Sequence, residues 1–180
     1  TTRGKAALPN TAGPTPGSTI TFVNSGVCNV TAAPATRCMP GVNFYANSQK
    51  MTAIISTTGK ASTTGTAYGG VGNGGFYSGI APGPYTLSGK IAAATDNGLA
   101  LSNITATLED GKYYSLYQSG FYDATAKTID GFILDDSFAP QIDFSVAYVR
   151  FVNAISNSSP MTLYAKSTVT GTEVPVGAEM

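Results

Sequence analysis

The stretches Thr21-Phe22-Val23-Asn24 and Asn43-Phe44-Tyr45-Ala46 stand near the start of this sequence and return, in the same order, near its end. The second copies are Arg150-Phe151-Val152-Asn153 and Thr162-Leu163-Tyr164-Ala165. Each stretch is short and rich in aromatic or β-branched residues, a composition that favours β-strands. The sequence therefore contains one β-rich unit followed by the opening of a second one.

The two copies differ in the spacing between their paired stretches. Phe22 and Tyr45 lie 23 positions apart, whereas Phe151 and Tyr164 lie 13 positions apart. The difference of ten residues is close to the length of the segment that two cysteines enclose in the first copy. The first copy is therefore expected to carry an insertion.

Cys28 and Cys38 bracket this insertion and are predicted to form a disulfide. Such a bond would stabilise the fold by about 2–3 kcal/mol through loop-closure entropy. A metal site is the other use for two cysteines, but the chain has no histidine and no third cysteine. The loop closed by this disulfide is either a binding loop on the rim of the fold or an insertion in which the disulfide only stiffens the loop.

The pattern of strands and turns predicts an all-β fold. Turn residues recur about every ten positions, and no segment shows a helical period. Glu109-Asp110-Gly111-Lys112 is expected to be a hairpin connection. The fold expected is an Ig-like antiparallel β-sandwich with an additional C-terminal strand or hairpin from an incomplete second repeat. The predicted strands cover residues 19–24, 42–46, 51–56, 75–80, 85–92, 102–108, 113–118, 128–134 and 145–152.

Three regions follow from this pattern. Residues 1–17 are rich in Pro and Gly and are expected to be an extended N-terminal arm or linker. Residues 18–140 are expected to form the β-sandwich domain. Residues 141–180 are expected to be an incomplete second repeat, a candidate segment for strand exchange or connection.

Further motifs follow the opening strands quoted above. They are Ala67-Tyr68-Gly69-Gly70-Val71, Pro82-Gly83-Pro84-Tyr85-Thr86, 107–114 and Leu134-Asp135-Asp136. Their order resembles a secreted repeat family known as domain of unknown function 4397. The resemblance covers residues 18 to about 137, and the opening of a second copy from about 147. It implies an extracytoplasmic β-sandwich that often occurs in tandem, without established catalytic residues.

The charge balance limits the classes of partner. Ten basic and ten acidic residues give a formal net charge of zero, and only 11% of residues are charged. This composition has no excess of positive charge with which to bind nucleic acid or an anionic membrane. With no apolar stretch of about twenty residues, membrane insertion is not expected either.

The sequence assigns no catalytic, cofactor-binding or metal-binding residues, and we expect no enzyme. Without histidine, neither a Ser-His-Asp nor a Cys-His site can form. The pair Glu109 and Asp110 falls in a turn, where acids are common for conformational reasons. The glycines at 70–75 match a nucleotide-binding spacing but follow no buried strand and open no helix. Three acids near the end of the first copy, Asp130, Asp135 and Asp136, do not have the spacing of a calcium loop.

An aromatic cluster marks a candidate contact surface. On one strand, Tyr113 and Tyr117 share a face and Tyr114 lies on the other. One interpretation is that these rings fill the core and cover a half-exposed face. The other is a contact surface for a glycan or a protein, formed by Tyr113, Tyr117, Phe121 and Tyr122.

The strand that opens the second copy is the candidate subunit interface. Apolar residues fall on both of its faces, as in a strand that is covered on both sides. We therefore expect it to complete its own domain or to add to the sheet of a neighbouring copy, which would build a homopolymer. The function expected is a non-enzymatic extracellular, pilus-like filament subunit, and the alternative is a monomeric cell-surface adhesion module that recognises a glycan or a protein. The interface residues are Phe144, Val146, Tyr148, Val149, Phe151 and Val152.

Overall fold

The computed structural model of this chain describes residues 17–28, 39–52, 64–136, 145, 149–155 and 158–176. The proposed arm at 1–16 lies outside these residues. So do Cys38 and the side chain of Cys28, and the predicted disulfide is therefore not part of the structure described here.

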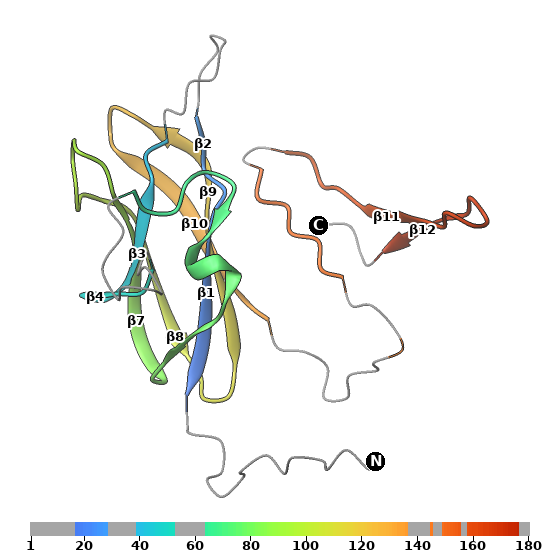
Figure 1. Cartoon of the computed structure of the whole chain (residues 1–180), viewed down its shortest axis with the longest axis horizontal. Helices are drawn as coiled ribbons and strands as arrows, with labels where there is room; N and C mark the ends of the chain where they lie inside the picture. Colours follow the sequence, from blue (N-terminus) through green and yellow to red (C-terminus); the bar gives the residue numbers. More distant parts are fainter. Residues whose placement is uncertain are drawn as a thin grey trace, which may run out of the picture.

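Two β-sheets pack face to face and confirm the all-β sandwich (Figure 1). In the first sheet the order is β10-β9-β1-β5, with β6 also pairing with β1 and β2 with β9. The strands of this sheet are β1 (Ser18–Asn24), β2 (Val27–Cys28), β5 (Gly70–Val71), β6 (Ser78–Ile80), β9 (Tyr113–Asp123) and β10 (Thr128–Asp135).

The second sheet has the order β4-β3-β7-β8 and is antiparallel throughout. A short 3₁₀ helix, η1 (Gly72–Gly75), precedes β6, and a separate hairpin pairs β11 (Leu163–Lys166) with β12 (Glu173–Val176). No helix in the described part of the chain is long and apolar enough to cross a membrane. The strands of the second sheet are β3 (Val42–Ala46), β4 (Gln49–Lys50), β7 (Gly83–Ile91) and β8 (Ala100–Leu108).

The first repeat copy supplies a central strand to each sheet. β1 lies between β9, to which it is parallel, and the antiparallel β5 and β6. β3 lies between β4 and β7. Phe22 of β1 and Phe44 of β3 are both fully buried and stack with ring centroids 5.3 Å apart. The residues that recur in the sequence are therefore those that join the two sheets.

The connection at Glu109-Asp110-Gly111-Lys112 is not a hairpin, and that prediction was wrong. It joins β8 of the second sheet to β9 of the first, so the two strands do not pair. The turn is instead tied to the start of β1: Ser18 Oγ donates to the Glu109 carbonyl at 2.6 Å, and Gly111 N donates to the Gly17 carbonyl at 3.0 Å. A turn motif indicates a reversal of the chain, but it does not say whether the flanking strands share a sheet.

Two other predicted strands differ in extent. Residues 75–80 form a strand only over Ser78–Ile80, because η1 occupies the preceding glycines. The strand expected at 51–56 is absent from its described part, Met51 and Thr52. Thr52 is instead a buried side chain whose Oγ1 accepts a hydrogen bond from Phe44 N at 2.8 Å.

The stacked pair predicts a measurable contribution to stability. Phe22→Ala or Phe44→Ala should lower the free energy of unfolding by about 3–5 kcal/mol, because each removes a buried ring and leaves a cavity. The double variant should cost less than the sum, because the two rings touch each other. Urea unfolding measures both effects, with Phe76→Ala as control, since that ring is 77% exposed. Equal effects at Phe22 and Phe76 would contradict this assignment of the core.

Candidate subunit interface

The outward side of β9 carries exposed aromatic rings. Tyr113 is 43% exposed, Tyr117 is half-buried and Phe121 is exposed. Tyr122 points the other way, is only 5% exposed and belongs to the core, so the structure separates it from the other three. Of the four residues predicted as a contact surface, three therefore lie where a partner has access.

Neighbouring strands extend this aromatic surface. Tyr77, just before β6, meets Tyr113 edge-on with ring centroids 5.6 Å apart. Phe132 of β10 stacks on Tyr117 at 5.1 Å and an interplanar angle of 11°. Such pairs add to the energy of simple burial and fix the orientation of the rings. We call Tyr77, Tyr113, Tyr117, Phe121 and Phe132 the aromatic face.

A buried carboxylate lies at the end of the aromatic face. Asp136 directly follows β10 and is 6% exposed. It accepts hydrogen bonds from Ser115 Oγ and from Tyr77 OH, the latter at 3.1 Å. Arg150 forms a salt bridge to it, and its second guanidinium nitrogen donates to the Asp135 carbonyl at 3.2 Å. A carboxylate this deeply buried requires such charge-assisted partners, because burial alone would penalise its charged form.

Burial raises the pKa of two tyrosines of the aromatic face. For Tyr77 the main cause is loss of solvent, and the nearby negative charge of Asp136 acts in the same direction. For Tyr117 burial is again the largest cause, followed by the charge of Asp136. Ser115 and Arg150 act in the opposite direction on both phenols. Both rings are thus held in the neutral form that can donate a hydrogen bond.

The strand predicted at 145–152 is not present in its described part, and this departs from the expectation. Residues 149–155 form no strand, and they lie over the outward side of β9 and β10. Val149 is exposed and Phe151 and Val152 are half-buried, while Phe144, Val146 and Tyr148 lie outside the described residues. Apolar residues on both faces of a segment indicate that its side chains will be buried. Packing against the face of a sheet can bury them as well as pairing with another strand can.

The fit between this segment and the sheet is loose. One cleft of about 380 Å³ remains between Phe132 and Leu134 on the sheet and Phe151 and Val152 on the segment. A second cleft of about 230 Å³ lies between Ser119 and Asn153. Both clefts are open to solvent, so the segment does not pack tightly on the sheet along its whole length. The salt bridge of Arg150 is therefore the most specific contact between the segment and the sandwich.

The hairpin β11–β12 stands away from both sheets (Figure 1). Its register runs from Leu163 opposite Val176 to Lys166 opposite Glu173, and a salt bridge at 3.2 Å joins that last pair. Tyr164 is 59% exposed and Val174 is 51% exposed. The hairpin thus presents apolar side chains and a backbone edge that the described sandwich does not cover.

The three acids near the end of the first copy do not form a common site. Asp135 binds Lys112 at 3.0 Å, Asp136 binds Arg150, and Asp130 is exposed. Lys112 also pairs with Glu109 at 3.0 Å, and these two carboxylates, Glu109 first, raise its pKa. Within the described residues, no group of three or more Asp, Glu, Cys or His gathers as metal ligands.

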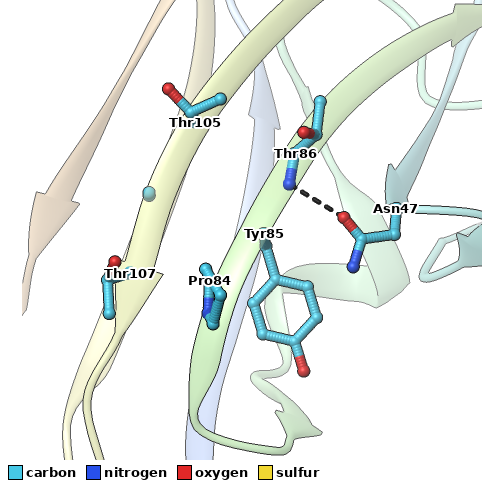
Figure 2. Close-up of a pocket in the computed structure, with 7 residues that line it drawn as sticks. Asn47, Pro84, Tyr85, Thr86, Thr105 and Thr107 are labelled. Atoms are coloured by element: carbon cyan, nitrogen blue, oxygen red, sulfur yellow. Dashed lines mark hydrogen bonds between the residues drawn. The ribbon is translucent and has the colours of Figure 1, made fainter.

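A third cleft lies on the other sheet, where β7 begins and β8 ends (Figure 2). Asn47, in the turn after β3, has a left-handed φ of 54°. Its Oδ1 accepts a hydrogen bond from Thr86 N at 2.9 Å, which fixes the amide. The lining is uncharged and rich in hydroxyl groups: Asn47, Pro84, Tyr85, Thr86, Thr105, Ala106 and Thr107.

Comparisons of this chain with protein-family models, with curated proteins and with solved structures find no match. The resemblance to domain of unknown function 4397 therefore stays a prediction from the sequence motifs. Functional assignment depends on the geometry described above.

The part of this interface that the motifs did not reveal is the link between Arg150, Asp136 and Tyr77. The motif Leu134-Asp135-Asp136 closes the first copy, and the sequence predicts no partner for its two acids. One signal was present in the repeat itself, because Arg150 occupies the position of Thr21 and is the only charged residue in either copy of that stretch.

The raised tyrosine pKa values predict the alkaline behaviour of the chain. A folded pKa above the ordinary value of about 10 means that the stability from the neutral phenols is fully present below pH 10. It is lost as the pH rises through the folded pKa values. In a spectrophotometric titration of phenolate absorbance, Tyr77→Phe should remove one late-titrating group. The wild-type chain is the reference for the size of the late phase. A late phase unchanged by Tyr77→Phe would contradict the assignment.

Proposed function

We propose that this chain is a non-enzymatic extracellular structural protein whose copies assemble into a filament by β-strand addition. The observation that carries the proposal is the contrast between the two repeat copies. In the first copy, β3 pairs with β4 on one side and β7 on the other. In the second, β11 pairs with β12, and no further strand of the described chain lies beside either of them.

The sandwich also offers edges to which another strand can add. β8 and β10 are the outer strands of their sheets on one side, and each is at least eight residues long. Their outward backbone groups have no strand partner in the described part of the chain. Such edges are templates for pairing with another chain, and a head-to-tail contact of this kind does not close on itself.

The composition supports self-association at a cell surface. A formal net charge of zero gives copies of this chain no long-range repulsion. The resemblance to a secreted tandem-repeat family supports the extracellular location and the Ig-like variant of the sandwich. Together these features favour a repeating structural subunit over an enzyme.

Electron microscopy and size-exclusion chromatography of the purified chain test this proposal. We expect linear polymers of the intact chain, and a folded monomer after deletion of residues 145–180, because the deletion removes the hairpin β11–β12 and the segment that precedes it. Tyr164→Asp should also reduce assembly by placing a charge on the exposed face of β11. Thr168→Asp, at an exposed position in the turn of the same hairpin, is the matched control and should assemble normally. A wild-type chain that stays monomeric at all concentrations would contradict the proposal.

A second candidate function is a monomeric surface module that binds a neutral saccharide, and the cleft in Figure 2 favours it. The lining has no charge, Asn47 is held rigidly, and Thr105 and Thr107 project from β8 on the side of the sheet that faces solvent. Hydroxyl and amide groups on a rigid sheet suit the hydroxyl groups of a neutral sugar.

The saccharide candidate is tested by titration with a panel of neutral oligosaccharides. If the cleft binds them, Thr105→Val with Thr107→Val should weaken binding about three- to tenfold per lost hydrogen bond while preserving side-chain shape. Asn103→Ala on the same strand, outside the cleft lining, is the control and should bind as the wild type does. Equal losses in both variants would count against this cleft as the binding site.

A further inference from the structure

We propose that the contact of Arg150 with Asp136 forms between molecules, so that residues 150–155 of one copy bind the β9–β10 surface of the next copy. We call this intermolecular contact the joint. The inference rests on the proposed function and identifies the partner as a second copy of this chain. It also identifies the specific contact, Arg150 of the donor on Asp136 of the acceptor.

The acceptor half of the joint is built by the sandwich alone. Ser115 comes from β9, Tyr77 lies just before β6, and both donate to the carboxylate of Asp136. Asp136 N also donates to the Tyr113 carbonyl at 2.7 Å, which fixes the backbone of Asp136 against β9. A preorganised and nearly buried carboxylate of this kind favours a cation with several donors, and arginine supplies them in a planar fork.

The donor half has arginine at position 150, where the first repeat copy has Thr21. Thr21, in the first copy, is buried within β1 beside Ser115. Its counterpart Arg150 is 45% exposed along its side chain and reaches Asp136 from outside the sheet. The first copy therefore uses this position for packing inside a sheet, whereas the second uses it to dock on a sheet. The substitution converts a strand residue into a docking residue.

The contact can be exchanged between copies at little cost. In the described chain, residues 149–155 have no strand pairing with the sandwich, and two clefts remain beneath the segment. The thirteen residues between Asp136 and Arg150 span up to about 45 Å when extended, enough to reach a neighbouring molecule. An exchange between copies keeps the same salt bridge and the same side-chain contacts. It also carries the hairpin β11–β12 to the neighbour, where the open strand edges lie.

Disulfide cross-linking of the full chain tests the joint. Leu134 and Val152 line opposite sides of one cleft, so cysteines at these two positions meet only when the segment is seated. For Leu134→Cys with Val152→Cys, oxidation should give a ladder of covalent multimers on a non-reducing gel. A mixture of two chains that each carry one of the introduced cysteines, in addition to Cys28 and Cys38, should give a mixed dimer. The parent chain and a Leu134→Cys, Thr168→Cys variant are controls and should give neither product.

The outcomes separate this inference from the proposed function. An intrachain cross-link only, with no mixed dimer, overturns the intermolecular joint even where microscopy shows filaments. Covalent dimers without longer products support the joint but contradict a filament. A second pair, Phe132→Cys with Asn153→Cys, repeats the test if the first pair does not fold, because both residues line both clefts. Arg150→Glu should abolish the mixed dimer, whereas Lys166→Glu, at an exposed lysine of the hairpin, should not.

Discussion

The stacking of Phe22 on Phe44 is the contact on which the fold depends. It joins the central strand of the first sheet to the second strand of the other sheet, and both rings are fully buried. The rest of the core forms around this pair because β1 is flanked on both sides in its sheet and β3 in its own. The same two positions recur in the second copy as Phe151 and Leu163, where they have no such surroundings. Within the described residues, the repeated stretch that builds the core in the first copy therefore lies outside both sheets of the sandwich in the second.

A buried polar network also shapes the interior and limits which residues fit. Gln118 of β9 is fully buried, and its Oε1 accepts a hydrogen bond from Ser102 of β8 at 3.2 Å. Gly89 of β7 makes room for it, since a Cβ at that position would lie 1.9 Å from the same oxygen. The two sheets are therefore matched by polar as well as apolar contacts. This favours one arrangement of the sheets over others in which apolar faces slide past each other.

Strand positions were predictable from the sequence where alternation and turn residues agreed, as for β1, β3, β8 and β10. β9 extends to Asp123, beyond the predicted end of the strand at residue 118. Gly120 adopts a φ of 86°, and the strand continues to pair with β2 at Phe121 and Tyr122. Period-two patterns specify which side chains share a face, but not which strand lies alongside. The turn at Glu109 was interpreted incorrectly for that reason, and the described part of the strand predicted at 145–152 forms no strand.

The candidate interface was predictable only in part, for a related reason. Aromatic spacing placed Tyr113 and Tyr117 on one face, and the structure has them there. Tyr122 differs from Phe121 by one position, and one position is enough to move a side chain from the surface to the core. The link between Asp136 and Arg150 depends on tertiary proximity, which local periodicity does not encode.

The difference between Thr21 and Arg150 makes the second copy more than a partial duplicate. Thr21 is buried in β1 beside Ser115, a position that does not suit a guanidinium unless a buried partner neutralises its charge. Placed outside a sheet, the same arginine has a partner in Asp136, which Ser115 and Tyr77 already orient. The acidic group closes the first copy and the basic group opens the second, so complementary charges meet at the junction between two successive units. Such an arrangement allows units to follow one another head to tail, whether the following unit belongs to the same chain or to the next one.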